Sequence, residues 1–264
     1  MKEFDTAKKA AIEAGEVIKK YFGNTDYKLK GRANPVTAAD IKSQEIIEKN
    51  IMDNFPDDSI IAEEGLKNIK DRNRIWIVDP LDGTVNFAHS FPHFAVSIGF
   101  LCDNVIRFGI VYDCIKNEMF WAVKDLGSYL NDKRIFVSKV LSISESLLAT
   151  GFAYDRAERA EFYCSYYSHF LKKSHDIRRC GAASLDMAYV ASGRLDGYWE
   201  YSLKPWDVAA GRIIIEEAGG MVSDFSGNPW NLDMNSMLNW GEEVLATNSI
   251  IHSDMISEIG KIRK

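Results

Sequence analysis

Two aspartates, Asp79 and Asp82, stand where a strongly apolar segment runs into a turn. The string over Trp76–His89 is WIVDPLDGTVNFAH, in which Pro80 stiffens the bend. Such a turn can aim both carboxylates and the Leu81 carbonyl at one point, and a hard divalent cation prefers oxygen ligands of this kind. A lone Asp-Gly pair after a strand is usually no more than a turn. The complete string favours a metal site.

Gly83 and Thr84 follow the second aspartate directly. If a helical turn starts at this point, its backbone N–H groups and its dipole would receive a phosphate oxygen lying between protein and metal. The same turn therefore predicts a place for a phosphoryl group beside the cation.

A third carboxylate, Glu63, follows a short strand predicted over Ser59–Ala62, and Glu64 comes next. By itself, an acidic pair at a strand end is most often exposed to solvent. Carboxylates gathered in one cleft, however, repel each other and stay ionised at neutral pH only where cations are present. In combination with the Asp79 turn, Glu63 favours metal binding.

A fourth acid, Asp207, opens an apolar helix after Pro205. Taken alone, it is more often a helix-capping residue. The small residues Ala209, Ala210 and Gly211 would let the start of this helix pack closely against another backbone, and this would bring Asp207 into a shared site.

Two weaker signals come from the same half of the chain. Gly181–Ala183 precedes a predicted helix and offers N–H groups to a ligand, although such a segment is more often merely a helix start. Glu200, near the end of a predicted strand, could bind a substrate hydroxyl or could equally be a solvated strand end.

Other catalytic and binding motifs are absent from the sequence. His89 and His93 have i,i+4 spacing, but Phe91-Pro92 between them argues against a helix and therefore against a helical zinc motif. The chain has no P-loop, no GxGxxG and no GxSxG string.

The elements that must position these residues follow from periodicity. Helices are predicted over Phe4–Phe22 and Ala38–Asn54. Short strands are predicted at 59–62 and 75–78, and the strands at 95–101, 105–112 and 118–123 suggest an antiparallel meander, with a further hairpin at 131–132. Beyond residue 140, helices at 156–172, 182–192 and 206–218 alternate with strands near 176 and at 196–201, and a last helix follows Asn248. The stretch 224–243 is expected to form a long surface loop.

Composition limits the class of protein. The 264 residues include 46% apolar and 27% charged residues, which is typical of a globular protein with one domain or two packed subdomains. The formal charge of -6 argues against a general nucleic-acid surface, so an anionic substrate must find its cations locally. Met1–Asp5 does not resemble a signal peptide, and no run approaches the ~20 apolar residues that span a membrane. We expect a cytoplasmic protein with no membrane partner, with no zinc or disulfide framework, and with free thiols at Cys102, Cys114, Cys164 and Cys180.

With these residues named, the sequence resembles the inositol monophosphatase family, within the wider group of lithium-sensitive, magnesium-dependent phosphatases. WIVDPLDGTVNFAH is similar to its first signature, and WDVAAGRIIIEEAGG over Trp206–Gly220 is similar to its second. The resemblance implies an α+β fold, a layered αβαβα sandwich of the inositol monophosphatase and fructose-1,6-bisphosphatase type, commonly a homodimer. We expect an N-terminal subdomain over residues 1–140, with the antiparallel sheet and the metal-binding turn, and a C-terminal α/β subdomain over 141–264.

The resemblance also implies two or three Mg²⁺ ions and a substrate pocket on matching positions. The first Mg²⁺ would be held by Glu63, Asp79 and the Leu81 carbonyl, the second by Asp79, Asp82 and Asp207, and a weaker third by Glu63 and Asp40. Gly83 and Thr84 would contact the phosphate. The pocket for the polyol would be lined by Asp82, Gly181, Ala183, Glu200 and Asp207. Lys30 is similar to the loop lysine of the family. The family usually has Ser or Thr where Ala182 stands, and this loses one side-chain hydroxyl.

The expected reaction is hydrolysis of a phosphate monoester without a phosphoenzyme. Two metals ~3.5–4 Å apart would bind the phosphate and activate a water. Glu63 and Thr84 would orient this water and help deprotonate it, and Asp40 is the third predicted catalytic residue. The first choice of substrate is myo-inositol 1-phosphate, and fructose 1,6-bisphosphate is a close second, with a second phosphate held by Arg32, Arg178, Arg179 and Lys204. A 3'-phosphoadenosine-type bisphosphate nucleotidase is a further alternative. A protein of another class, which binds a partner on the same scaffold without catalysis, is disfavoured because every expected carboxylate is present.

Overall fold

A computed structural model describes residues 1–24, 27–29, 35–63, 65–67, 71–230 and 240–263. Its helices are α1 (Lys2–Tyr21), α2 (Ala38–Asn54), α3 (Thr84–Ala88), α4 (Ala160–Leu171), α5 (Ala183–Ala191), α6 (Pro205–Glu217) and α8 (His252–Ile262), with a 3-10 turn at Ile143–Glu145. Within the described ranges, no helix combines the length and the apolar character that crossing a membrane requires.

The larger sheet has eight strands in the order β10-β9-β8-β7-β6-β5-β3-β4. Their bounds are β3 (Ser59–Ala62), β4 (Gly65–Lys67), β5 (Arg74–Asp82), β6 (Ala95–Cys102), β7 (Val105–Asp113), β8 (Glu118–Val123), β9 (Gly127–Leu130) and β10 (Lys133–Ile135). The strands pair antiparallel except for β3 and β5, which run parallel. The expected meander is therefore confirmed. A separate two-stranded ribbon pairs β1 (Tyr27–Leu29) with β2 (Pro35–Thr37).

The smaller sheet has five strands in the order β12-β11-β13-β15-β14. They are β11 (Leu147–Thr150), β12 (Asp176–Arg178), β13 (Gly197–Tyr201), β14 (Met221–Ser223) and β15 (Glu243–Thr247). β11 runs parallel to β12 and β13, whereas β13, β15 and β14 pair antiparallel. All strands of this sheet come from the second half of the chain.

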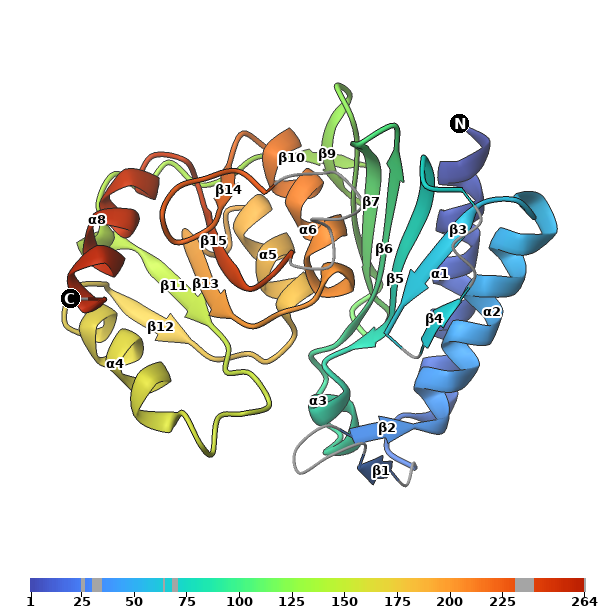
Figure 1. Cartoon of the computed structure of the whole chain (residues 1–264), viewed down its shortest axis with the longest axis horizontal. Helices are drawn as coiled ribbons and strands as arrows, with labels where there is room; N and C mark the ends of the chain where they lie inside the picture. The colour runs from blue at the N-terminus through green and yellow to red at the C-terminus, as the bar shows by residue number, and fades with distance from the viewer. Residues whose placement is uncertain (25–26, 30–34, 64, 68–70, 231–239, 264) are drawn as a thin grey trace.

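The elements stack in five layers (Figure 1). Helices α1 and α2 cover the outer face of the larger sheet, α5 and α6 lie between the two sheets, and α4 and α8 cover the outer face of the smaller one. Three apolar cores hold the layers together: one contains Trp76, the middle one contains Ile214, and the third contains Phe170. The α+β fold class and the αβαβα sandwich are confirmed.

Most of the predicted elements lie where the periodicity put them, with end shifts of a few residues. The expected surface loop at 224–243 is wrong at several points, because Phe225 and Trp240 are buried, at 3% and 2% exposed, and β15 begins at Glu243. Residues 231–239 lie outside the described part of the chain. The prediction failed because the segment is rich in turn-forming residues, although apolar side chains at its two ends pack into the protein.

The approach of α6 to the larger sheet depends on two glycines that face each other. Gly99 on β6 pairs with Gly109 on β7; Gly99 lies against Ala209 and Ala210 of α6, and Gly109 lies against Ala210 and Ile213. A methyl group placed on Gly109 would lie 2.6 Å from the Ala210 carbonyl oxygen. The close packing expected from the small residues of α6 is therefore confirmed, and its counterpart is this glycine pair.

We predict that Gly109→Ala lowers stability by about 1–3 kcal/mol or more, because backbone atoms of α6 cannot yield as a side chain could. Gly260→Ala is the matched control: this glycine lies within α8 and a methyl there meets nothing within 4 Å. It should raise stability by up to about 1 kcal/mol. Urea unfolding measures both, and an unchanged midpoint for Gly109→Ala would contradict the packing argument.

Candidate active site

The turn that carries the two aspartates is an irregular end of β5. Asp79 pairs with Ser97 of β6 and Asp82 pairs with Ala95, so β5 contains one residue more than its partner over this stretch. Such a bulge re-aims side chains that would otherwise alternate between the faces of a sheet. The Leu81 amide donates to Asp79 Oδ1 at 2.9 Å. At Gly83 the backbone enters the left-handed region, with φ +90°, and the short helix α3 begins.

Helix α2 fixes this turn from the side of the first core. The Ser43 hydroxyl donates to the Pro80 carbonyl at 2.7 Å. Asp40 is fully buried; its Oδ2 closes a capping box with Thr37 at the start of α2. Its Oδ1 lies 3.0 Å from the Thr84 hydroxyl oxygen, which lies equally close to the Leu81 carbonyl oxygen. Asp40 therefore orients Thr84 while it caps a helix.

Glu63 and Asp207 reach the turn from two other elements. Glu63 follows β3, the parallel neighbour of β5, so that both strands deliver carboxylates to the same edge of the sheet. Asp207 lies in the first turn of α6, where the Lys204 amide donates to its Oδ2 at 2.7 Å. The Ser97 hydroxyl of β6 donates to the Trp206 carbonyl and ties that helix start to the sheet.

Asp79, Asp82 and Asp207 each place a carboxylate oxygen within 4.8 Å of the others. Burial raises the pKa of Asp79 well above its usual range, and the charges of Glu63, Asp82 and Asp207 raise it further. Burial, followed by the charges of Asp82 and Glu63, does the same to the pKa of Asp207. These carboxylates destabilise one another in their ionised form.

This cluster fits divalent cations. Among the described residues, the donors recorded to the oxygens of Asp79, Asp82 and Asp207 are neutral: the amides of Leu81, Ser184 and Lys204 and the Ser184 hydroxyl. None of these donors offsets the negative charge. Oxygen ligands without nitrogen or sulfur suit Mg²⁺, which keeps several waters and takes few carboxylates. The predicted ligands Glu63, Asp79, Leu81, Asp82 and Asp207 all line one cavity.

That cavity has a volume of about 310 Å³ and opens between the two sheets. The predicted substrate contacts also line it, namely Gly83, Thr84, Gly181, Ala183 and Glu200. Burial raises the pKa of Glu200 to about 7, although a hydrogen bond from the Tyr198 hydroxyl lowers it in part. The predicted metal ligands and the predicted substrate contacts therefore all line this one cavity. Asp40 does not line it but contacts Thr84, which does.

Several contributors were not predicted. Ser184 donates both its amide and its hydroxyl to Asp82 Oδ2, at 2.7 and 2.5 Å, and it partly counteracts the burial that raises the pKa of Asp82 to about 6. Tyr154 and Arg156 line the cavity from the loop after β11. No local sequence signal marks these residues, because their role depends on contacts with distant segments.

Among the predicted cations, Arg179 and Lys204 line the cavity. The prediction for Arg178 is wrong, because its guanidinium is exposed and pairs with Asp176 at 2.5 Å outside the cavity lining. Arg178 is the last residue of β12, whereas Arg179 follows the strand and lines the cavity. Lys30, Arg32 and Glu64 lie outside the described residues.

Comparisons with known proteins agree with this architecture. A model of the inositol monophosphatase family matches residues 1–263. The inositol-1-monophosphatase of Synechocystis sp. is 41% identical over 254 residues, which cover 95% of this chain and 86% of that protein. Nus factor SuhB of Haemophilus influenzae is 40% identical over 255 residues, covering 95% and 93%. The crystal structure of extragenic suppressor protein suhB from Bartonella henselae aligns with a TM-score of 0.91 at 34% identity, covering 99% of both chains.

The layered fold and the family match place this chain in the class of phosphatases. More narrowly, the chain belongs to the inositol monophosphatase family.

Proposed function

We propose that this protein is a magnesium-dependent phosphomonoesterase that hydrolyses myo-inositol 1-phosphate to inositol and phosphate. The observation that carries the proposal is the gathering of Glu63, Asp79, Asp82 and Asp207 in one cavity that also contains arginine side chains. Carboxylates alone would repel a phosphate ester. Carboxylates loaded with Mg²⁺ would attract it.

The ligands proposed for Mg²⁺ are Glu63, Asp79 and the Leu81 carbonyl for one ion, Asp79, Asp82 and Asp207 for a second, and Glu63 with Asp40 for a weaker third. When bound, Mg²⁺ supplies Lewis-acid polarisation of the phosphate and acidification of water. The protein contributes a rigid frame, since the bulge in β5, the start of α6 and the end of β3 are each held by backbone pairing or hydrogen bonds.

Thr84 is the residue proposed to position the nucleophilic water. The Thr84 hydroxyl has one proton, which it can donate to Asp40 Oδ1 or to the Leu81 carbonyl; in either case its oxygen keeps a lone pair that can accept a hydrogen bond from water in the cavity. Glu63 is the second proposed contact to that water. The Gly83 and Thr84 amides are proposed to hold the phosphate, and Asp82, Gly181, Ala183, Glu200 and Asp207 the polyol.

We predict that Thr84→Val lowers kcat by about 10²–10⁴-fold, the range typical of losing a proton-transfer group. Thr84→Ser retains the hydroxyl and should recover most of the activity. Phosphate release at saturating Mg²⁺ measures both variants. If Thr84→Val and Thr84→Ser were equally impaired, Thr84 would be a packing residue and not a contact to the water.

Substrate identity is tested by comparing phosphate release from inositol 1-phosphate, fructose 1,6-bisphosphate and 3'-phosphoadenosine 5'-phosphate, with and without Mg²⁺. A preference for inositol 1-phosphate supports the first proposal, and a preference for either bisphosphate replaces it with the corresponding alternative. Phosphate release from none of them would refute the phosphomonoesterase proposal for these substrates.

Arg179 separates the substrates further, because it lines the cavity while its neighbour Arg178 does not. We predict that Arg179→Ala raises KM for fructose 1,6-bisphosphate by about 10–100-fold more than KM for inositol 1-phosphate, the value of a charge-assisted hydrogen bond to a second phosphate. Arg178→Ala is the matched control and should change neither constant. Equal effects of Arg179→Ala on both substrates would show that no second phosphate is bound there.

A second role is favoured by one comparison, since relatives at 40% identity carry the name of a factor and not of an enzyme. A partner-binding function on this scaffold is tested by complementing a deletion strain with the Asp79→Asn variant. Rescue of growth by this variant would indicate a role that does not need hydrolysis.

The proposal includes a cytoplasmic homodimer and a functional division near residue 140. Light scattering of the purified protein tests the dimer.

Helices α5 and α6 contact strands of both sheets, so the proposed subdomains would unfold together and not as separate units.

A further inference from the structure

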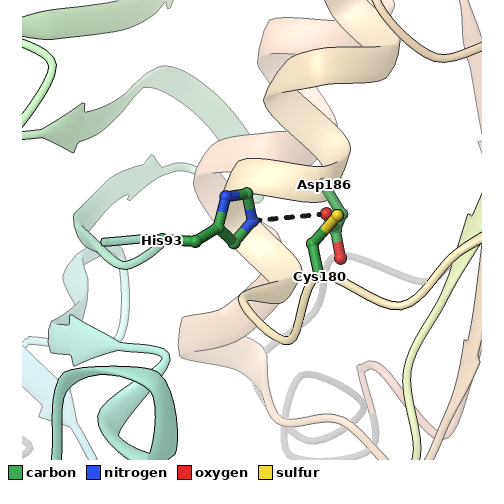
Figure 2. A group of neighbouring side chains, drawn as sticks. All are labelled: His93, Cys180 and Asp186. Carbon is green, nitrogen blue, oxygen red and sulfur yellow. Dashed lines mark ion pairs between the residues drawn. The ribbon is translucent and has the colours of Figure 1, made fainter. Parts of the chain in front are cut away.

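Three side chains capable of binding a metal meet outside the carboxylate cluster. His93 comes from the segment between α3 and β6, Cys180 follows β12, and Asp186 lies on α5. Their ligand atoms, the imidazole nitrogen, the thiol sulfur and a carboxylate oxygen, lie within 4.8 Å of one another. Figure 2 shows the three side chains pointing toward one another, with His93 Nε2 and Asp186 Oδ1 joined at 3.5 Å.

The cluster is buried and leaves polar atoms unsatisfied. The side chains of Asp186 and His93 are 1% and 9% exposed. Within the described part of the chain, neither Asp186 oxygen nor His93 Nε2 has a hydrogen-bond partner. A buried carboxylate without hydrogen bonds costs free energy, and nearly all such groups in folded proteins have a partner. The His93 imidazole and the Asp186 carboxylate therefore point toward each other, and neither has a hydrogen-bond partner among the described residues.

The side chain of Asn86 holds the backbone on two sides of the cluster, and it does so without bonding to any of the three ligand atoms. Asn86 Nδ2 of α3 donates to the His93 carbonyl at 2.7 Å and to the Cys180 carbonyl at 2.8 Å. The edge of the His93 ring packs against Tyr189, with ring centroids 5.7 Å apart. Two of the three segments are thus fixed relative to each other before any cation binds.

We propose that His93 Nε2, Cys180 Sγ and the Asp186 carboxylate bind one transition-metal cation of the Zn²⁺ class, at a site distinct from the Mg²⁺ cluster. Bonds of about 2.0–2.3 Å in a tetrahedral arrangement place ligand atoms ~3.3–3.7 Å apart, and the 3.5 Å between His93 and Asp186 lies in this range. Three protein ligands would leave a fourth position for water.

The chemistry of the ligands separates the two sites. Imidazole and thiolate favour borderline or soft cations, whereas the all-oxygen cluster of Asp79, Asp82 and Asp207 favours Mg²⁺. Binding to the Cys180 sulfur requires that the thiol lose its proton to solvent as the cation arrives. His93 finds its partners more than eighty residues away in the sequence.

Occupancy would have a structural consequence near the carboxylate cavity. Asp186 lies two residues after Ser184, which holds Asp82 with two hydrogen bonds. A cation shared by His93 and Asp186 would tie α5 to the segment that follows α3. It would thereby stabilise the orientation of Ser184 toward Asp82.

The test uses Co²⁺ as a spectroscopic probe, added to untagged, chelator-treated protein in saturating Mg²⁺. The wild type should develop a thiolate-to-cobalt charge-transfer band that saturates at one Co²⁺ per chain and is abolished by equimolar Zn²⁺. Cys180→Ser should eliminate the band, and Asp186→Asn should weaken Co²⁺ binding by at least about tenfold. Cys164→Ser, which changes an exposed cysteine, is the control and should retain the full band.

The outcomes that overturn the proposal are equally specific. They are no charge-transfer band in the wild type, a band that survives in Cys180→Ser, or a band that disappears in Cys164→Ser. Should Asp186→Asn fail to fold, thermal unfolding of the other proteins decides: Zn²⁺ should raise the Tm of the wild type and of Cys164→Ser but not of Cys180→Ser. None of these measurements depends on phosphatase activity.

Discussion

Asp79→Asn is expected to lower phosphate release by at least about 10³-fold, because Asp79 is the one carboxylate proposed to contact both principal Mg²⁺ ions. Weakened Lewis-acid stabilisation of several kcal/mol corresponds to this loss of rate. Asparagine has the same shape and can still accept the hydrogen bond from the Leu81 amide. The variant should therefore fold, and circular dichroism with a steady-state assay over a range of Mg²⁺ concentrations measures both properties.

The control for this variant is Asp125→Asn, which removes an exposed carboxylate beside Lys124. Its turnover should equal that of the wild type. Retention of more than about a tenth of the activity by Asp79→Asn would rule out the proposed metal bridge. In metal-free buffer Asp79→Asn should also be more stable than the wild type at pH 8, since it removes one charge from a repulsive cluster.

The second large effect is a fall in the stability of the metal-free protein as the pH rises, which Mg²⁺ should counteract. Burial raises the pKa of Asp82 to about 6 from the usual 3.8, and that of Glu200 to about 7 from 4.5. Between pH 4 and pH 7 these two carboxyl groups therefore bind more protons in the folded protein than in the unfolded chain, and this outweighs buried His252, whose pKa is lowered by burial. Stability must then fall as pH rises through this window. We expect the Tm of the metal-free protein to decrease from pH 5 to pH 8.

Mg²⁺ should raise the Tm more at pH 8 than at pH 5, because it binds the ionised carboxylates and stabilises the folded state by mass action. Glu200→Gln removes one of the two titrating groups and should reduce the fall in Tm near pH 7, while the fall near pH 6 should persist. Differential scanning fluorimetry at several pH values, with Mg²⁺ or EDTA, measures these shifts. A Tm that rises from pH 5 to pH 8 in EDTA would contradict the pKa argument.

Local patterns were sufficient to predict the helices and the meander because the helices repeat apolar residues at helical spacing and the meander strands are apolar runs of six to nine residues bounded by turns. Both ends of α2 (Ala38–Asn54) and both ends of β8 (Glu118–Val123) agree with the predicted bounds. Short strands of the smaller sheet were missed. β11 and β15 are buried strands of four and five residues that lack the alternation by which a half-exposed strand is recognised.

The site divides in the same way. The carboxylates Glu63, Asp79 and Asp207 were predicted because two strands run into the first two and a helix begins at the third. Glu200 was only a weak signal until the resemblance to a known family supported it, and the role of Asp40 came from that resemblance alone. Ser184 was missed because its contact with Asp82 spans 102 positions in the sequence. The His93 cluster was missed for the same reason, since one histidine, one cysteine and one aspartate carry no signal until α5 packs beside the loop after α3. The roles assigned to the predicted site residues stay predictions.

The glycine pair beneath α6 has a consequence for how the molecule assembles. Asp207 reaches the other carboxylates only when α6 docks on Gly99 and Gly109, which lie about a hundred positions earlier in the chain. Contacts of such long range form slowly, because the entropy of closing the intervening loop opposes them until packing compensates. We therefore expect the anionic centre to be completed late in folding.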